Sequence, residues 1–341
     1  MRLIERVWHG DTIAGRLARA ALLPLEGVYR GAVALRGELY DRGLLPARTS
    51  DIAVVSVGNL TVGGTGKTPV SAWLAARLAA MGFAPAIVLR GYGDDEPLVH
   101  ARLNPGIPVV VGADRSAGIT QAAARGANVA ILDDAFQHRR TARDLDIVLV
   151  SADDWNGRHH LLPAGPYREP LSGLSRASIV VITHKAASEA RVAQVERAVR
   201  DVAGGATVAV AKLTLGQIVR ESPAGASKAA ETLAGKRVLA VAAVGNPAAF
   251  FVQLESLGAR VDGRSFPDHH AFTRDDVATI LETAATCDYV ICTLKDAVKL
   301  GPLWPAGNTA LWYVSLAVGI ESGGSAIDRL LMRLRGRIDV N

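Results

Sequence analysis

Cysteine is scarce in this sequence, because only two of its 341 residues are cysteines. A disulfide-stapled scaffold needs several, so that class of protein is excluded. Cys287 and Cys292 lie in or beside an apolar run, which favours buried free thiols over a metal pair or a disulfide. The sequence therefore predicts a protein of a reducing, cytoplasmic compartment.

Long apolar runs are also missing. No stretch approaches the length that a helix needs to cross a bilayer, and we find no cleavable signal pattern. The composition, with 49% hydrophobic and 21% charged residues, is that of a folded protein, and the length allows two domains with sizeable cores. The net charge of +5 permits an anionic partner such as a nucleotide, a nucleic acid, an acidic lipid surface or a phosphorylated substrate, without choosing among them.

Lysine is absent from residues 1–48, which instead hold eight arginines and five acidic residues. A helix starting after Pro24 is predicted to have one apolar face, because apolar residues recur there at steps of three and four (Leu25, Val28, Ala32, Leu35 and Leu39). Such a segment can lie in a membrane interface with its arginines meeting lipid phosphates, or it can be a helical pair packed on the main domain. The pattern alone leaves both interpretations open.

From residue 50 onward, short apolar runs alternate with alanine-rich helical patterns. Uninterrupted apolar runs of this length are typical of parallel strands buried on both faces. The pattern therefore predicts a doubly wound α/β domain that binds its ligands at the carboxyl ends of the strands. The expected strands are 52–57, 86–89, 109–111, 129–132, 147–150 and 179–183, and the clearest helices are 70–81, 116–125 and 187–201.

A second, smaller α/β domain is predicted from residue 206. The predicted domains are 1–48, 49–205 and 206–341, and the closing basic helix, 326–335, is expected to be able to pack back on the middle domain. Within the second domain we expect 208–215 as a strand or linker, 222–230 as a loop, strands at 236–244, 289–293 and 310–314, and helices near 247–257 and 274–285.

A glycine-rich turn follows the first predicted strand, in the segment V-G-N-L-T-V-G-G-T-G-K-T-P over 57–69. Its glycines let backbone N–H groups approach an anion, and the helix that follows adds the positive end of its dipole. Lys67 can reach the outer phosphates of a nucleotide, and the Thr68 hydroxyl can hold Mg²⁺. Thr61 stands where the strict phosphate-loop pattern has glycine. The alternative is a glycine-rich surface turn with an exposed lysine.

Asp133 and Asp134 end the apolar strand at 129–132. In nucleotide-binding folds a carboxylate at such a strand end holds Mg²⁺ directly or through water. Aspartate also ends strands simply because it favours turns.

Asp94, Asp95 and Glu96 follow another strand. Three adjacent carboxylates are costly in a closed site unless cations such as Mg²⁺ or a lysine share it. A solvated acidic turn is the alternative.

Two further segments carry candidate polar groups. The stiff, proline-rich stretch 162–170 presents Arg168 and Glu169, which suit phosphate recognition or form a surface ion pair. The stretch 265–270 places His269 after a proline and an aspartate. A capped loop histidine and an acid–base group are both compatible with that pattern.

Taken together, these residues resemble one family, the tetraacyldisaccharide 4′-kinases of Gram-negative bacteria. Threonine at position 61 is also typical of that family. The matching segments occur in family order over most of the chain: 57–69, R-G-Y-G (90–93), D-E-P (95–97), D-R-S (114–116), L-D-D-A-F-Q-H (132–138), L-P-A-G-P-Y-R-E (162–169), F-P-D-H-H (266–270) and K-D-A-V-K (295–299).

The resemblance implies a kinase with a P-loop NTPase-like doubly wound sheet. Such an enzyme transfers the γ-phosphate of ATP to the 4′-hydroxyl of a tetraacylated glucosamine disaccharide 1-phosphate, which gives lipid IVA in lipid A biosynthesis. ATP and Mg²⁺ are the implied cofactors. The implied location is peripheral, on the cytoplasmic face of the inner membrane, with no nucleic acid and no obligate protein partner.

The resemblance also implies roles for particular residues. Asp95 would receive the proton of the sugar hydroxyl, with His269 orienting or tuning it, and Asp134 would line the same catalytic site as Lys67, which neutralises the β- and γ-phosphates. The remaining expectations are a nucleotide loop of Thr61, Val62, Gly63, Gly64, Thr65, Gly66, Lys67 and Thr68, metal ligands among Thr68, Glu96 and Asp133, and substrate contacts from Gln137, His138, Arg168 and Glu169.

Two features depart from the family pattern. The family usually has a longer insert after R-G-Y-G, whereas here Gly93 runs almost directly into Asp94, which becomes a second candidate for the base. The family also usually has a glutamate where this chain has Leu294.

Two other functions are weighed against the kinase. One is a P-loop ATPase- or GTPase-type switch protein, although Thr183-His184-Lys185-Ala186 lacks the aspartate that would select guanine. The other is a non-catalytic module that binds anionic lipid, which leaves the phosphate loop unexplained.

Overall fold

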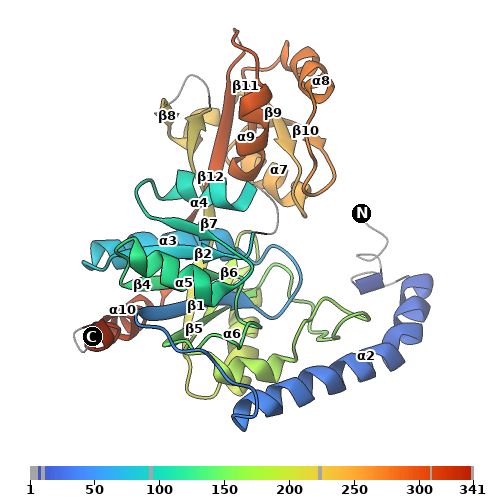
Figure 1. Ribbon diagram of the computed structural model, residues 1–341. Helices are drawn as coiled ribbons and strands as arrows, with labels where there is room; N and C mark the ends of the chain where they lie inside the picture. Colours follow the sequence, from blue (N-terminus) through green and yellow to red (C-terminus); the bar gives the residue numbers. More distant parts are fainter. Residues whose placement is uncertain (1–6, 9–11, 92–94, 222–224, 308, 339–341) are drawn as a thin grey trace. The chain divides into compact units, whose positions relative to one another are not determined.

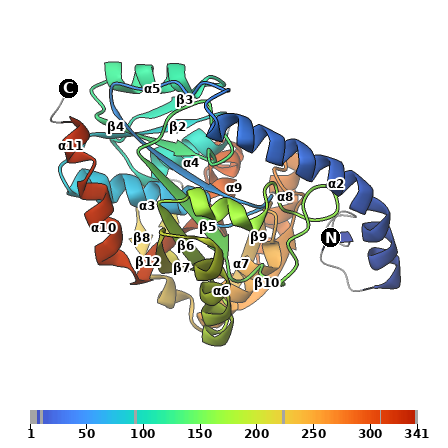
Figure 2. The ribbon, with the colours of Figure 1, turned by 90° about the horizontal axis from the view of Figure 1, so that it is seen from below.

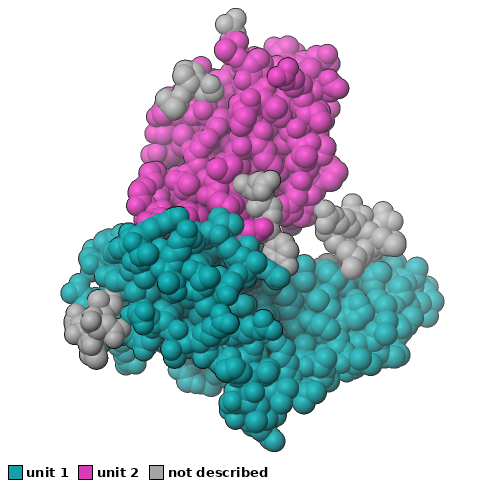
Figure 3. Space-filling model, viewed as in Figure 1, with its two compact units in different colours: residues 1–90, 110–212, 320–341 teal, residues 91–109, 213–319 magenta. Residues whose placement is uncertain are grey.

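The computed structural model describes residues 7–8, 12–91, 95–221, 225–307 and 309–338. The chain forms two compact units, neither of them continuous in sequence. Unit 1 comprises residues 1–90, 110–212 and 320–341, and unit 2 comprises residues 91–109 and 213–319 (Figure 3). The segment 91–109 thus belongs with the later half of the chain, and the C-terminal helices belong with unit 1.

A parallel sheet forms the centre of unit 1 (Figures 1 and 2). Its strand order is β7-β6-β5-β1-β4-β2-β3, and the pairings from β7 through to β2 are parallel. Every residue of β1, β2 and β4 is buried, as expected for strands covered on both faces. The strands are β1 (Ala53–Asn59), β2 (Pro85–Leu89), β3 (Val109–Val111), β4 (Val129–Asp133), β5 (Leu145–Ser151), β6 (Ile179–His184) and β7 (Thr207–Arg220).

Helices cover this sheet and confirm the predicted doubly wound α/β class. Helix α3 packs on β1, β2 and β4, helix α5 packs on β2 and β4, and helix α6 packs on β6. The expected closing helix is two helices, α10 and α11, separated by a turn at residues 333–334. The helices of unit 1 are α2 (Ile13–Asp41), α3 (Lys67–Ala80), α5 (Arg115–Ala124), α6 (Glu189–Val202), α10 (Gly324–Met332), α11 (Arg335–Ile338) and the 3₁₀ turn η1 (Leu171–Arg176).

Helix α2 is long and amphipathic. It begins at Ile13, capped by the Thr12 side chain, so Pro24 lies inside the helix and not just before it as the sequence had predicted. The buried positions Gly15, Arg19 and Glu26 face the rest of the unit. Within the described residues, no helix combines the length and the apolar character that crossing a membrane requires.

The strands of unit 2 follow the order β10-β9-β11-β12-β7, with the short β8 antiparallel to β7. Strands β9, β10, β11 and β12 pair in parallel. Its elements are α4 (Asp95–Leu103), β8 (Ser227–Lys228), η2 (Ala230–Leu233), β9 (Arg237–Ala242), α7 (Pro247–Ser256), β10 (Arg260–Ser265), α8 (Arg274–Ala284), β11 (Tyr289–Thr293), α9 (Leu294–Leu300), η3 (Gly301–Leu303) and β12 (Leu311–Ser322).

Unit 2 also shows where the sequence-based predictions were incomplete. The acidic segment after residue 94 starts helix α4 instead of forming a turn. The expected loop 222–230 contains β8, and β10 is a strand that was not predicted. Residues 222–224 lie outside the described residues.

Gly58 is a position in β1 where packing excludes any side chain. An added Cβ would lie 2.6 Å from Phe136 Cβ and 2.7 Å from the Phe136 main-chain nitrogen. Phe136 is fully buried, so neither its Cβ nor its main-chain nitrogen can move aside at low cost. We expect Gly58→Ala to lower the free energy of unfolding by about 2 kcal/mol or more, measured by urea unfolding.

Gly27→Ala in helix α2 is the matched control. No atom lies within 4 Å of a Cβ added at Gly27, so the change is expected to be neutral or to stabilise by up to about 1 kcal/mol. Equal stability of the two variants would contradict the close approach at Gly58.

Candidate active site

A glycine-rich loop joins β1 to α3 in unit 1. Gly63 has φ +129° and Gly66, the N-cap of α3, has φ +90°, a region that only glycine enters without strain. A Cβ added at Gly63 or Gly64 would meet no atom within 4 Å, so this side of the loop is open. An open glycine loop that runs into a helix N-terminus, whose first N–H groups lack helical partners, has the geometry that suits an anion.

Neighbouring segments hold this loop from both sides. The Thr183 hydroxyl, in β6, donates to the Thr65 carbonyl at 2.9 Å. The Val62 amide donates to the Pro166 carbonyl at 2.8 Å, and the Arg168 amide donates to the Leu60 carbonyl at 2.7 Å. The loop conformation is therefore fixed by the protein itself.

Lys67 lies at the centre of a cluster of charged and polar side chains. Its Nζ donates to Asn59 Oδ1 at 3.2 Å and lies 3.8 Å from Asp134 Oδ1. Arg168 donates to the same Asp134 oxygen at 2.8 Å and also to Asn59 Oδ1. The structure thus brings together three predicted site residues, Lys67, Asp134 and Arg168.

The backbone of Asp134 is held in an unusual conformation. Its φ of +46° is rare for a residue other than glycine, and such strain gathers at functional sites. Arg115 stabilises this turn by donating to the carbonyls of Asp133 and Asp134, at 2.9 and 3.1 Å. Burial acts to raise the pKa of Asp134, but Lys67 and Arg168 outweigh it and hold the pKa below its ordinary value.

Asp133 is a second, buried carboxylate beside the loop. The Ser71 hydroxyl of α3 donates to Asp133 Oδ1 at 3.0 Å, as does the Asp134 amide at 3.0 Å. Thr68 is the second residue of α3. In the described part of the chain, no group of three or more His, Cys, Asp or Glu side chains could hold a metal ion by itself.

The other predicted substrate residues differ in their contacts. Gln137 donates to the Asn59 carbonyl at 3.0 Å, which attaches it to the Lys67 cluster. Burial and nearby arginines lower the pKa of His138 to about 4, so this ring is neutral at pH 7. Glu169 is buried and pairs with Arg176 at 2.8 Å.

Unit 2 places Asp95 beside His269. Asp95 begins α4 and its side chain is 5% exposed. His269 Nδ1 lies 3.7 Å from Asp95 Oδ2, and His269 itself has φ +60°. Lys295, at the start of α9, lies 3.1 Å from His269 Nε2. Asp94, the other candidate base, lies outside the described residues.

Leu294, where the sequence departs from the family pattern, lies in an apolar contact. It is 5% exposed and packs with Val99 of α4 and Val298 of α9. This cluster joins the helix that starts with Asp95 to the helix that carries Lys295. Leu294 therefore helps to position both residues through packing.

Asn59, Arg115 and Lys295 were missed as site residues. Asn59 is a polar residue ending an apolar strand just before the glycine loop, and that position alone could have marked it. Arg115 and Lys295 lie in segments that match the family, D-R-S and K-D-A-V-K, but without any assigned role.

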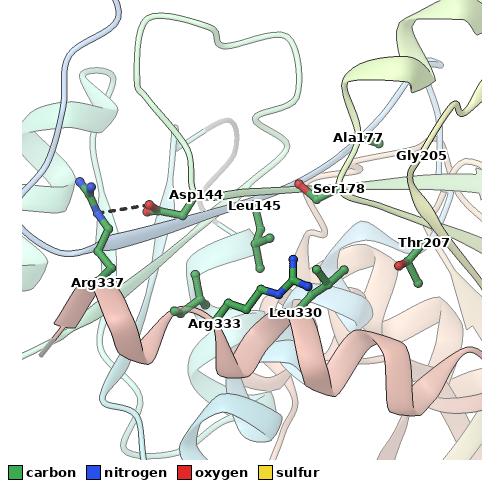
Figure 4. A pocket seen from close by; sticks show the side chains of 10 residues that line it. Asp144, Leu145, Ala177, Ser178, Gly205, Thr207, Leu330, Arg333 and Arg337 are labelled. Atoms are coloured by element: carbon green, nitrogen blue, oxygen red, sulfur yellow. Dashed lines mark ion pairs between the residues drawn. The ribbon is translucent and has the colours of Figure 1, made fainter.

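A pocket of about 470 Å³ lies elsewhere in unit 1 (Figure 4). It is lined by Asp144 and Thr207, at the amino ends of β5 and β7, and by Leu330 and Arg333 of the C-terminal helical segment. Figure 4 shows Arg337 paired with Asp144, at 3.2 Å. The glycine loop follows the carboxyl end of β1. Because the strands of this sheet are parallel, the pocket and the loop lie at opposite ends of the strands.

A parallel α/β sheet, a glycine loop after its first strand, a lysine opening the next helix and an aspartate pair at a neighbouring strand end define the P-loop class of nucleotide-binding proteins. The family model described as tetraacyldisaccharide-1-P 4′-kinase matches residues 18–335. The chain belongs to this family.

Individual relatives agree. A tetraacyldisaccharide 4′-kinase of Anaeromyxobacter dehalogenans (strain 2CP-C) is 43% identical, over 96% of this chain and 94% of the relative. One of Halorhodospira halophila is 37% identical over 97% of each chain. The crystal structure of LpxK from Aquifex aeolicus in complex with ATP has a TM-score of 0.74 and 28% identity, covering 93% of this chain and 99% of that one.

Proposed function

We propose that this protein transfers the γ-phosphate of ATP to the 4′-hydroxyl of a tetraacylated glucosamine disaccharide 1-phosphate. It is a kinase of lipid A biosynthesis, as its family membership over residues 18–335 indicates. The observation that carries the proposal is the glycine loop with Lys67 set against Asp134 and Arg168, in a chain that 4′-kinases match along almost its whole length.

Unit 1 would bind the phosphates of ATP. The loop amides and Lys67 would neutralise phosphate charge, and Arg168 offers a fork-shaped donor set that suits a phosphate or sugar oxygen. The Thr68 hydroxyl and the Asp133 carboxylate are hard oxygen donors of the kind Mg²⁺ prefers, with Glu96 as a further candidate ligand. Mg²⁺, when bound, would supply positive charge for the phosphate oxygens.

Phosphoryl transfer asks the protein mainly for positioning and charge neutralisation. The new bond joins the 4′-oxygen to the γ-phosphorus, the bond to the β-phosphate oxygen breaks, and ADP leaves. The 4′-hydroxyl proton must go to a base, and we assign this role to Asp95, with His269 beside it. Asp134, Gln137, His138 and Glu169 are proposed to shape the surroundings of the reacting groups.

The direct test is transfer of labelled phosphate from ATP to the disaccharide in detergent micelles. A labelled bisphosphorylated lipid is the expected product. Hydrolysis of ATP without any labelled lipid would overturn the proposal and favour the switch-protein alternative.

We also propose that helix α2 holds the enzyme peripherally at the cytoplasmic face of the inner membrane, where the acyl chains of the substrate reside. Its outward face is apolar over several turns, and Ile13 and Val28 are 71% and 73% exposed. Exposed aliphatic residues on one helix face suit burial at the lipid boundary. The large exposed side chains of this face are Ile13, Leu17, Leu25, Val28 and Leu35.

The inner face of α2 contacts the proposed substrate site. The Tyr29 hydroxyl donates to the Arg168 carbonyl at 3.0 Å, and Arg36 donates to the Gln137 carbonyl at 2.9 Å. The same helix thus presents apolar side chains outward while supporting two residues assigned to the substrate.

The double change Leu17→Glu and Val28→Glu is expected to weaken binding to vesicles of phosphatidylethanolamine and phosphatidylglycerol by about 100-fold. Each aliphatic side chain is worth about 1.5 kcal/mol or more on burial, and every 1.4 kcal/mol is tenfold. Vesicle co-sedimentation measures the effect, and activity should fall more on vesicle-borne substrate than in detergent micelles.

Ala34→Glu is the control for added charge. Ala34 is exposed on the same helix but lies about 120° around its axis from Val28. Its vesicle affinity should stay close to that of the unchanged protein. If the double variant bound vesicles equally well, the proposed membrane face would be wrong.

A further inference from the structure

Lys295 contacts both members of the Asp95–His269 pair. Its Nζ lies 3.1 Å from His269 Nε2 and 3.9 Å from Asp95 Oδ2. On the other side of the ring, His269 Nδ1 lies 3.7 Å from the same Asp95 oxygen. The three side chains therefore form one closed cluster within unit 2, and Asp268 Oδ1, 3.9 Å from His269 Nε2, borders it.

The hydrogen-bonding capacities of these groups select one arrangement of protons. A lysine ammonium has three donors and no acceptor, whereas a neutral imidazole has one donor and one acceptor. Since Lys295 Nζ lies within hydrogen-bond distance of Nε2, a charged lysine requires Nε2 to accept. The ring proton is then on Nδ1, which is the nitrogen that faces Asp95. A doubly protonated ring would instead set an N–H group against the ammonium.

The main chain of Ala243 is hydrogen-bonded both to His269 and to Asp296, the residue that follows Lys295. The His269 amide donates to the Ala243 carbonyl at 3.2 Å, and the Ala243 amide donates to Asp296 Oδ2 at 3.1 Å. Asp296, the residue after Lys295, also accepts from the Thr293 hydroxyl at 2.7 Å. Together with the positive φ of His269, these contacts fix the main chain at both residues, so the lysine and the imidazole extend from neighbouring points of the fold.

Asp95 provides a second, independent observation. Its side chain is more than nine-tenths buried, and among the described residues neither of its oxygens accepts a hydrogen bond. A buried carboxylate in that condition calls for donors directed at it. The Nδ1–H of His269 is such a donor only if Lys295 keeps the proton on that nitrogen.

We propose that Lys295 is a positioning residue that holds His269 as the Nδ1–H tautomer, with its proton directed at Asp95. Lys295 acts through His269 and makes no contact with the substrate in this proposal. The kinetic consequence rests on the proposed 4′-kinase function, whereas the tautomer itself does not.

The first experiment reads the tautomer directly. The protein is labelled with ¹⁵N-histidine, and two-bond ¹H–¹⁵N correlations distinguish the protonated ring nitrogen from the bare one. The His269 signals are assigned by their loss in His269→Gln. In the unchanged protein we expect the Nδ1–H form, and in Lys295→Met a shift toward the Nε2–H form that is usual for free histidine. Lys295→Arg, which keeps the charge and the donors, should restore the Nδ1–H form.

The second experiment measures kinetics. Lys295→Met is expected to lower kcat about tenfold, with little change in KM for ATP. This effect is smaller than the roughly 10²–10⁴-fold contribution of a proton-transfer group itself, because Lys295 acts only through His269. Lys295→Arg should recover most of the rate. Lys236→Met removes an exposed lysine of the same unit away from the cluster and should leave the rate unchanged.

The possible results distinguish the positioning role of Lys295 from the proposed kinase function. An Nε2–H ring in the unchanged protein overturns the proposal even if no Lys295 variant folds. The proposal is also overturned if folded Lys295→Met keeps the Nδ1–H tautomer. It is overturned as well if this variant has a raised KM for ATP and an unchanged kcat, because Lys295 would then bind nucleotide. If the tautomer shifts as expected but the unchanged protein phosphorylates no lipid, the proposed function fails and the positioning role stands.

Discussion

Asp95→Asn is expected to lower kcat by about 10²–10⁴-fold, because asparagine keeps the shape of the side chain but cannot accept the proton of the sugar hydroxyl. KM for ATP should change little, since the residues assigned to the phosphates lie in the glycine loop and around Lys67. Initial rates of labelled phosphate transfer, with both substrates saturating, give the measurement. An Asn variant with near-normal kcat would remove Asp95 from the role of base.

The same variant is expected to keep or raise Tm. Asp95 is a buried carboxylate whose oxygens accept no hydrogen bond from the described residues, and the nearest nitrogens, those of the His269 ring and the Lys295 ammonium, lie 3.7 and 3.9 Å away. Burying such a charge costs folding free energy, which the neutral amide avoids. Loss of rate without loss of stability would show that the sequence keeps this carboxylate for chemistry.

Asp94→Asn is the matched control, one residue earlier in the same acidic segment. The shortened loop after residue 93 made Asp94 an alternative base, and Asp94 lies outside the described residues. We expect this variant to keep most of its activity. If Asp94→Asn abolished transfer and Asp95→Asn did not, the assignment of the two residues would be reversed.

Much of the fold of unit 1 could be predicted from sequence because its strands are buried on both faces. Burial on both sides produces nearly continuous apolar runs, as in β1 (Ala53–Asn59) and β6 (Ile179–His184), which stand out against the polar loops. β10 (Arg260–Ser265) escaped prediction for the opposite reason. It is an edge strand, R-V-D-G-R-S, with exposed and half-exposed residues, so no apolar run marks it.

Helix α4 shows a different limit of prediction from sequence. Its acidic first turn and Pro97 are ordinary features of a helix start, but three adjacent carboxylates also suit a turn, and local pattern cannot choose between them. The contact that favours the helix is the packing of Val99 on Leu294 and Val298. Those residues lie almost two hundred positions further along the chain, so only the folded structure reveals the contact.

The candidate site could likewise be predicted only in part. The glycine loop and Lys67 could be recognised because their spacing is fixed by local backbone chemistry. The position of Asn59 could have marked it, but its hydrogen bonds from Lys67 and Arg168 could not be predicted, because Arg168 reaches it from a distant proline-rich segment. Partners brought together by tertiary folding leave no spacing rule in the sequence.

Lys67→Met is expected to lower kcat/KM by about 10³-fold or more, through both a higher KM for ATP and a lower kcat. In the proposed reaction the ammonium neutralises charge on the outer phosphates, and charge that develops during transfer is what such groups stabilise most. Methionine keeps the length and apolar stem of the side chain, so loss of packing is a small part of the effect. Steady-state rates over a range of ATP concentrations separate the two parameters.

Lys67→Arg tests whether charge alone is sufficient. Lys67 Nζ fits between Asn59 Oδ1 and the Gly63 carbonyl, at 3.2 and 3.3 Å, a space suited to a compact ammonium and not to a planar guanidinium. We therefore expect the arginine variant to bind ATP better than Lys67→Met but to recover only a small part of kcat. Full activity in either variant would mean that the loop does not hold the transferred phosphate. Arg168 and Asp134 are unchanged in both variants. A loss of rate in either variant would therefore be due to the missing or displaced ammonium of Lys67.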